Sequence, residues 1–199
     1  MKVRVGILAI QGDVDAHARA LARLDTEAVP VLREADLADL AALILPGGES
    51  TTIAKGIERQ KLWEPLRAFA ASGRPVFGTC AGAILLAKQV ENAPVPTLGL
   101  LDVIAVRNAY GTQVDSFAAE VDAGSAKGLE GLRCVFIRAP QLRPSRPGVE
   151  VLARVDGLPV LVRERNLFAA TFHPELTDDA RVHALVLGSG GRGPTTSRV

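Results

Sequence analysis

The sequence predicts a three-layer α/β fold, in which helices cover both faces of a mostly parallel central sheet that carries a small antiparallel extension. Two patterns predict it. In the first half of the 199 residues, short apolar runs alternate with segments of helical spacing, which is typical of parallel sheets. From about residue 100, apolar runs follow one another across short links, which favours antiparallel pairing.

The first half contains the alternating elements. Its predicted strands cover residues 3–10, 29–32, 41–45 and 75–79. One predicted helix follows Asp13, a plausible helix cap. The other predicted helices cover residues 51–60, 63–71 (ended by Gly73) and 81–88.

The second half is rich in strands. They are predicted at residues 101–106, 116–121, 133–137, 149–155, 159–163 and 167–172, and a closing helix at 178–187. Residues 188–199 (GSGGRGPTTSRV) lack the apolar side chains that a core requires, so we expect a disordered tail there. The chain length suits one domain, which we expect to span residues 1–187.

Composition excludes several classes of protein. The net charge is +1, from 23 Lys and Arg against 22 Asp and Glu, so neither nucleic acid nor an anionic membrane is an expected partner. The N-terminus does not form a secretory signal, and no run reaches the roughly 18 apolar residues of a membrane span. The two cysteines, Cys80 and Cys134, form no disulfide framework. We therefore expect a cytoplasmic protein.

One segment has the form of a nucleophile elbow. Residues 78–82 (GTCAG) follow a predicted strand and open a predicted helix, with Cys80 at the turn. Glycines on both sides leave room for a strained backbone, and the amide of Ala81 points to where an oxyanion would form. The alternative is a small buried cysteine in a glycine-rich turn. Cys134 has no such turn and is predicted to be inert core.

A thiolate also needs a base and a group that orients the base. His173 ends an apolar run, and Glu175, two residues on, can face the same side of an extended chain. Because parallel strands deliver their carboxyl ends to one edge of a sheet, His173 can meet Cys80 there. The alternative is a capping histidine beside a solvated carboxylate. His17 and His183 fall within helical patterns and are predicted to be surface or packing residues.

A glycine-rich loop follows the third predicted strand. In residues 45–52 (LPGGESTT), Ser50 or Thr51 can cap the next helix. The loop does not match a phosphate-binding loop, because no Gly-Lys-Ser/Thr follows and the loop carries the acidic residue Glu49. A loop amide that faces Cys80 would supply a second oxyanion donor, and an ordinary βα turn is the alternative.

Taken together, the segments resemble the class I, triad-type glutamine amidotransferases. More narrowly, the chain is similar to the family of glutaminase subunits of pyridoxal 5′-phosphate synthase. The similarity lies in seven segments that occur in that family's order: residues 9–13 (AIQGD), 45–51 (LPGGEST), 78–82 (GTCAG), 107–111 (RNAYG), 114–117 (VDSF), 136–140 (FIRAP) and 172–176 (FHPEL). One position departs from it, since Thr112 stands where the family usually carries an arginine.

The resemblance implies Cys80 as nucleophile, His173 as general base and then acid, and Glu175 as the residue that orients His173. It also implies a class I glutamine amidotransferase fold of flavodoxin or Rossmann type. The residues expected to contact glutamine or its oxyanion are Gly47, Gly48, Glu49, Ala81, Arg107, Ile137 and Arg138. Fixed cations suit the α-carboxylate of free glutamine. From the residues alone, the two arginines would be solvated side chains at strand edges.

The function implied is hydrolysis of L-glutamine to L-glutamate and ammonia, without a cofactor or a metal in this chain. The ammonia would pass to a (β/α)₈-barrel synthase subunit that builds pyridoxal 5′-phosphate within a hetero-oligomeric complex. Three alternatives stay open at this point. They are a glutaminase of another biosynthetic pathway, a free-standing γ-glutamyl thiol hydrolase, and a non-catalytic interaction subunit.

Overall fold

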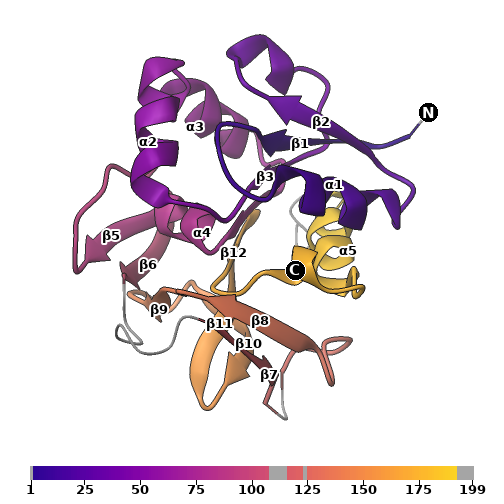
Figure 1. The fold of residues 1–199 in the computed structure, drawn as a ribbon, viewed down its shortest axis with the longest axis vertical. Coiled ribbons are helices and arrows are strands. Elements are labelled where there is room, and N and C mark those ends of the chain that lie inside the picture. Colours follow the sequence, from indigo (N-terminus) through magenta and orange to yellow (C-terminus); the bar gives the residue numbers. More distant parts are fainter. Residues whose placement is uncertain (1, 108–115, 123–124, 192–199) are drawn as a thin grey trace, which may run out of the picture.

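A seven-stranded sheet forms the centre of the computed structural model, which describes residues 2–107, 116–122 and 125–191 (Figure 1). Its strand order is β10-β11-β12-β4-β3-β1-β2. Five neighbouring strands run parallel: β1 (Arg4–Leu8), β2 (Glu27–Val31), β3 (Ala42–Leu45), β4 (Val76–Thr79) and β12 (Leu167–Ala170). Two further strands extend it in antiparallel fashion: β11 (Leu158–Glu164) and β10 (Glu150–Val155). The predicted fold class is confirmed.

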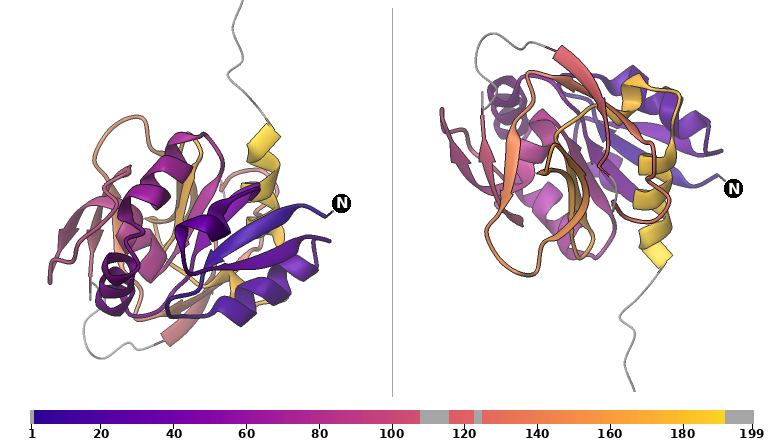
Figure 2. Two further views of the ribbon diagram at one scale, coloured as in Figure 1. Left: turned by 90° about the horizontal axis from the view of Figure 1, so that it is seen from above. Right: turned by 90° about the horizontal axis from the view of Figure 1, so that it is seen from below.

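Two smaller sheets accompany the central one. β6 (Leu101–Val106) pairs in parallel with β5 (Ala87–Glu91) and antiparallel with β9 (Gln141–Pro144). β7 (Ser116–Glu120) and β8 (Arg133–Ile137) form an antiparallel pair. Figure 2 shows β5 and β6 at the end of the molecule that lies opposite the N-terminus.

Helices cover both faces of the central sheet. α2 (Ser50–Arg59), α3 (Trp63–Ala71) and α4 (Ala81–Leu86) pack on one face, and α1 (Val14–Ala22) and α5 (Arg181–Gly188) on the other (Figure 1). Alternation along β3 explains the two layers, because successive strand residues face opposite sides. Leu43 and Leu45 pack beneath α2 and α3, whereas Ala42 and Ile44 pack with residues of α1 and α5.

Two local predictions are wrong and a third is confirmed only in position. The helix expected over residues 81–88 ends at Leu86, because Ala87 begins β5 and pairs with Leu101. Asp13 stands at the cap position of α1, as predicted, but its side chain accepts no helix N–H. The cap of α2 is Glu49 rather than Ser50 or Thr51, and its carboxylate accepts hydrogen bonds from the amides of the first turn.

The chain beyond α5 continues into a short 3-10 turn, Ser189–Gly191. The rest of the predicted tail, residues 192–199, lies outside the described residues, as does the segment 108–115 with Thr112. Within the described part of the chain, no helix is both long and apolar enough to cross a membrane.

Candidate active site

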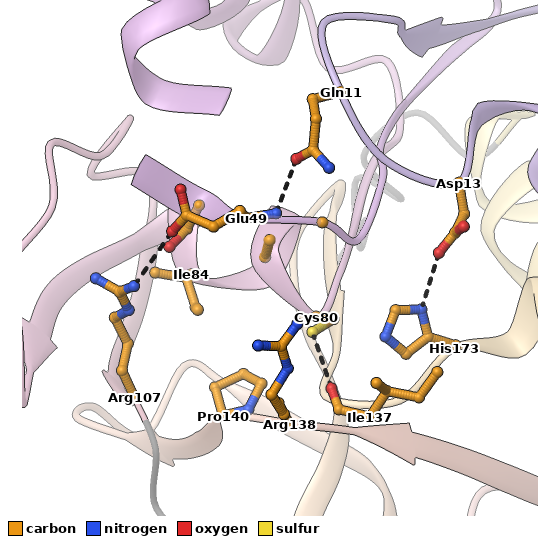
Figure 3. Close-up of a pocket in the computed structure, with 13 residues that line it drawn as sticks. Gln11, Asp13, Glu49, Cys80, Ile84, Arg107, Ile137, Arg138, Pro140 and His173 are labelled. Atoms are coloured by element: carbon orange, nitrogen blue, oxygen red, sulfur yellow. Dashed lines mark hydrogen bonds and ion pairs between the residues drawn. The ribbon is translucent and has the colours of Figure 1, made fainter. Parts of the chain in front are cut away.

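A cavity of about 310 Å³ opens at the carboxyl ends of the parallel strands (Figure 3). Its volume falls at the lower end of the roughly 300–1,000 Å³ of small-molecule sites. The residues that line it are Gln11, Asp13, Gly48, Glu49, Ser50, Cys80, Ala81, Ile84, Arg107, Ile137, Arg138, Pro140 and His173. In Figure 3, Cys80 lies between Glu49 and Arg107 on one side and Asp13 and His173 on the other.

Cys80 sits in a strained turn between β4 and α4. Its φ of 47° and ψ of −103° lie where non-glycine residues are rare. The flanking glycines make this turn possible. A Cβ on Gly78 would lie 2.5 Å from the backbone of Gly82, and a Cβ on Gly82 would lie 1.9 Å from the Leu45 carbonyl oxygen. The elbow geometry expected from residues 78–82 is therefore present.

His173 reaches Cys80 because their strands are neighbours. β12 pairs directly with β4, and the amide of Cys80 donates to the carbonyl of Ala170 at 2.8 Å. Beyond β12, the amide of His173 donates to the carbonyl of Val135 in β8 at 2.8 Å. His173 is therefore positioned by β12, which precedes it, and by β8, to which its amide is bonded.

Glu175 lies behind the His173 ring. His173 Nδ1 and Glu175 Oε1 are 2.7 Å apart, and the Glu175 side chain is fully buried. The contact is the one expected from sequence, but the backbone is not extended. The chain turns into a 3-10 helix, Pro174–Leu176, directly after His173.

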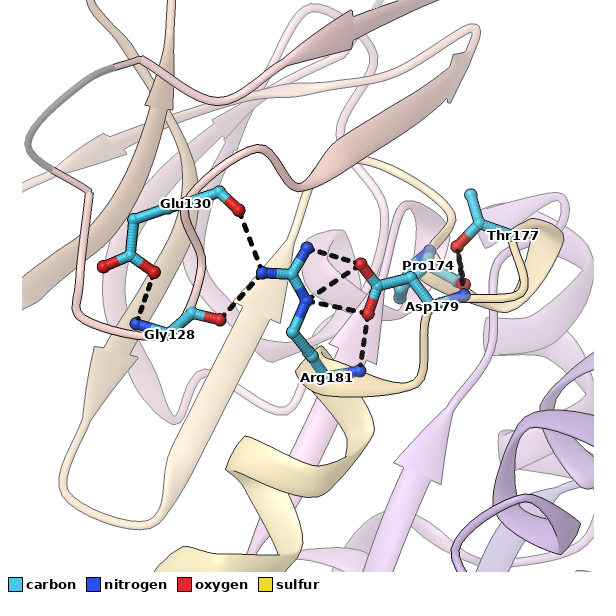
Figure 4. Close-up of polar contacts among 6 residues, drawn as sticks. All are labelled: Gly128, Glu130, Pro174, Thr177, Asp179 and Arg181. Atoms are coloured by element: carbon cyan, nitrogen blue, oxygen red, sulfur yellow. Dashed lines mark hydrogen bonds and ion pairs between the residues drawn. The ribbon is translucent and has the colours of Figure 1, made fainter.

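The segment that carries the pair is braced by Arg181 (Figure 4). Its guanidinium donates hydrogen bonds to both carboxylate oxygens of Asp179, at 2.7–3.0 Å. It also donates to the carbonyls of Gly128 and Glu130, each at 3.0 Å. Because residue 130 lies just before β8, the contacts to these two carbonyls tie the start of α5 to the strand whose end, Ile137, lines the cavity.

His173 is set up to carry a positive charge. Burial by itself lowers the pKa of His173. Hydrogen bonding to Cys80 and to Glu175, together with the negative charges of these groups, outweighs burial and raises the pKa to about 10. An imidazolium therefore faces the Cys80 sulfur at neutral pH. Cys134 is different. It is fully buried, and burial raises its pKa to about 12, so it stays a protonated core thiol.

The glycine loop packs directly against the reacting side chains. A Cβ on Gly47 would lie 2.4 Å from His173 Cε1 and 3.4 Å from Cys80 Cβ. Gly48 has a φ of +155°, and a Cβ there would lie 2.6 Å from Gln11 Oε1. That Gln11 oxygen accepts the amide of Glu49 at 2.8 Å. Only glycine fits at residue 47 without moving the histidine.

Charged side chains line the opposite side of the cavity. Burial favours a neutral Glu49, but hydrogen bonds from Thr51 and Thr52 outweigh it and lower the Glu49 pKa to about 2. Arg107 lies 3.5 Å from the Glu49 carboxylate and donates to the Ala93 carbonyl at 2.9 Å. Glu49 thus serves as helix cap and as partner of an arginine.

The chain beyond β8 closes the site. Arg138 adopts a φ of 42°, a second strained residue beside the cavity. The carbonyl of Ile137 lies 3.8 Å from the Cys80 sulfur, within reach of a weak hydrogen bond when the sulfur is protonated.

Most residues predicted for the site line the cavity, whereas Gly47 and Glu175 lie against His173. Sequence reasoning missed five lining residues: Gln11, Asp13, Ser50, Ile84 and Pro140. Sequence position could have identified Gln11 and Asp13. They follow β1, whose carboxyl end lies at the same edge as that of β4.

Asp13, His173 and Glu175 can each bring one potential metal ligand atom within 4.8 Å of the others. Asp13 Oδ2 lies 3.7 Å from His173 Nδ1, but this nitrogen is already bonded to Glu175. The group is therefore better explained as a histidine oriented by carboxylates than as a metal centre.

The site agrees with the similarity of this chain to known proteins. Residues 7–189 match the SNO glutamine amidotransferase family. A protein of Frankia alni named "Pyridoxal 5'-phosphate synthase subunit PdxT" is 49% identical over 195 residues, covering 96% of this chain and 98% of the relative. A protein of the same name from Carboxydothermus hydrogenoformans is 47% identical, covering 91% and 94%.

Solved structures show the same fold. A crystal structure described as a glutamine amidotransferase superposes with a TM-score of 0.88 at 47% identity and covers 94% of this chain and 99% of its own. PurLQS from Thermotoga maritima superposes with a TM-score of 0.67 at 20% identity, covering 94% and 99%, and so supports the fold alone.

Proposed function

The chain belongs to the SNO glutamine amidotransferase family, and on that premise we propose that it is the glutaminase subunit of a pyridoxal 5′-phosphate synthase. In that role it hydrolyses L-glutamine to L-glutamate and ammonia. The observation that carries the proposal is the joining of Cys80, His173 and Glu175 at one end of a cavity of about 310 Å³. Its other end carries arginines suited to an amino-acid carboxylate.

The first half of the proposed reaction makes a thioester. The Cys80 thiolate attacks the γ-carboxamide carbon of glutamine, and the carbonyl electrons move onto the oxygen. Amides of Ala81 and of the Gly47–Gly48 loop hold this oxyanion, each donor contributing about 10²–10³ in rate. The His173 imidazolium protonates the departing nitrogen as the C–N bond breaks. Ammonia and a γ-glutamyl thioester result.

The second half frees the enzyme. Neutral His173 now takes a proton from water, and the hydroxide attacks the thioester carbon. The C–S bond breaks, the sulfur leaves as thiolate, and His173 keeps the proton, so that the starting ion pair is restored. Glu175 holds the ring in the orientation needed in both halves.

Substrate selection is assigned to the charged side of the cavity. Arg107 and Arg138 supply cations for the α-carboxylate, and Glu49 with the Ile137 carbonyl supplies acceptors for the α-ammonium group. The low pKa of Glu49 keeps it an acceptor at neutral pH. Gly48 lines the cavity, where its backbone can contact the ligand.

The ammonia is proposed to pass directly to a synthase subunit, a (β/α)₈ barrel, within a hetero-oligomeric complex. Direct transfer matters because free ammonia becomes ammonium in water and loses its nucleophilicity. The names of the relatives support such a partner, since each is a subunit of pyridoxal 5′-phosphate synthase. A free-standing thiol hydrolase is the rival, and it requires full activity without any partner.

Ammonia release from glutamine tests the proposal. The full chain is assayed alone and with a synthase subunit, as wild type and as Cys80→Ala, with Cys134→Ala as the matched control. We expect release by the wild type and the control and none by Cys80→Ala. Equal release by wild type and Cys80→Ala would overturn the mechanism. Full release that no synthase subunit alters would favour the free-standing hydrolase.

A further inference from the structure

The second carboxylate oxygen of Glu175 raises a question that the triad leaves open. Oε1 bonds to His173, but Oε2 is buried and has no hydrogen-bond partner among the described residues. Burial of a carboxylate oxygen without a donor costs free energy, so the groups around Oε2 bear on how firmly Glu175 holds His173. The nitrogen beside it is His17 Nε2, at 3.5 Å.

His17 is a fully buried residue of α1, so of the two roles predicted for it, surface or packing, the surface role is wrong. Its Nδ1 lies 3.0 Å from Nε2 of His183 in α5, which is also buried. Its Nε2 lies 3.2 Å from Thr79 Oγ1, next to Cys80 in the elbow. The ring therefore spans from α5 to the back of the reacting groups.

The surroundings decide which nitrogen of His17 carries the proton. Nε2 lies 3.2 Å from Thr79 Oγ1 and 3.5 Å from Glu175 Oε2. An unprotonated Nε2 would place its lone pair beside the carboxylate, whereas a protonated Nε2 has two oxygens within reach, so the N–H belongs at Nε2. Nδ1 is then an acceptor for the N–H of His183 Nε2. His183 Nδ1, which has no partner among the described residues, is left as the unprotonated nitrogen. Every N–H in this arrangement has an acceptor.

The two buried histidines are neutral. Burial, and then the neighbouring charges of His183 and His173, hold the pKa of His17 well below its usual value. Burial and the nearby Arg23 lower the pKa of His183 to about 4. A neutral donor suits the site, because a second cation beside Glu175 would compete with the His173 imidazolium for the same carboxylate.

We propose that His17 is a positioning residue of the glutaminase reaction. Its Nε2–H is shared between Thr79 Oγ1 at 3.2 Å and Glu175 Oε2 at 3.5 Å, and it holds the carboxylate against His173. The proposal rests on the proposed function. It extends the line of contacts from Cys80 through His173 and Glu175 to two residues of helices α1 and α5, His17 and His183. The opposing view is that His17 merely fills the core.

Matched variants separate the two views. His17→Gln keeps an amide N–H near the Nε2 position, whereas His17→Leu has no N–H and His17→Asn places one near Nδ1 instead. We expect His17→Leu and His17→Asn to lower kcat for ammonia release, with a synthase subunit present, by about 10-fold or more with KM within about twofold. We expect His17→Gln to retain most of kcat. His17→Asn stands in if His17→Leu does not fold.

A second readout does not depend on turnover. The rate at which iodoacetamide alkylates Cys80 is followed by peptide mass at neutral pH, where Cys134 is shielded by burial. We expect slower alkylation in His17→Leu and His17→Asn and a near-normal rate in His17→Gln. In a Glu175→Gln background, His17→Leu should add little further loss, because it acts through Glu175.

The outcomes distinguish the two proposals. Wild type that releases no more ammonia than Cys80→Ala overturns the proposed function, and the alkylation rates still decide the role of His17. The role of His17 is overturned if His17→Leu and His17→Asn match the wild type. It is equally overturned if His17→Gln is impaired as much as they are, or if the loss is undiminished in the Glu175→Gln background.

Discussion

The two sides of the cavity are built differently. The acid–base side, formed by Gly47, His173 and Glu175, is buried, and the His173 and Glu175 side chains are 5% and 0% exposed. The arginine side, formed by Glu49, Arg107 and Arg138, is more open, and the Glu49 and Arg107 side chains are 52% and 18% exposed. Adjacent parallel strands and a glycine contact fix the first side, whereas a hydrogen bond and an ion pair of Arg107 hold the second.

This difference indicates a division of labour. Proton transfer needs one geometry, and the buried neighbours of His173 away from the cavity enforce it. Selection of a charged amino acid needs complementary groups that water can reach before the substrate binds. Changes on the acid–base side should therefore act on kcat, and changes on the arginine side on KM.

The largest effect is expected from His173→Gln. The variant removes the group that protonates the departing ammonia and later activates water, so kcat should fall by about 10⁴-fold, the upper end for general acid–base catalysis. Steady-state kinetics of ammonia release measure it. A rise in KM with an unaltered kcat would show that His173 only binds substrate.

Gly47→Ala should come next. Its Cβ would lie 2.4 Å from His173 Cε1, so the ring must shift, and a displacement of this kind costs about 10² in kcat. Gly148→Ala is the matched control, because a Cβ at Gly148 meets nothing within 4 Å. Similar kinetics for the two variants would mean that the glycine contact does not hold the acid–base side.

Arg107→Gln tests the other side. The variant keeps a donor but loses the cation, and a lost charge-assisted hydrogen bond should raise KM for glutamine about 10-fold. We expect kcat to stay within about threefold. A fall in kcat larger than the rise in KM would contradict the assignment of Arg107 to substrate binding alone.

The last prediction concerns stability rather than kinetics. The pKa of His173 is raised, so its stabilising contribution is fully present below about pH 6.5 and is lost as the pH rises through about 10. Urea denaturation of wild type and His173→Gln should show a difference in unfolding free energy that shrinks over this range. A difference that grows with pH would mean that the folded protein holds His173 neutral.

Sequence patterns predicted the acid–base side better than the arginine side. The strand before Cys80 and the strand before His173 are strongly apolar, so their place in the sheet and the meeting of their ends could be inferred. The role of Glu49 was partly missed. Its side chain caps α2, and only the three-dimensional path of the loop shows that its carboxylate is already shared with Thr51, Thr52 and Arg107.

Other features depend on contacts that cannot be inferred from the spacing of residues in the sequence. Helical spacing at His17 and His183 does not reveal that these two positions face one another at 3.0 Å beneath the site. The early end of α4 depends on the pairing of Ala87 with Leu101, a contact between segments that have no common local pattern. Tertiary pairing overrides local propensity in such cases.

The central claim is that Cys80 carries the glutamyl group during the reaction. The most direct test is to mix the full chain and a synthase subunit with glutamine, quench the mixture in acid within the first turnovers, and map modified peptides by mass spectrometry. The account predicts a γ-glutamyl adduct on the peptide that contains Cys80 and none on the peptide that contains Cys134. An adduct elsewhere, or rapid ammonia release by Cys80→Ala, would contradict it.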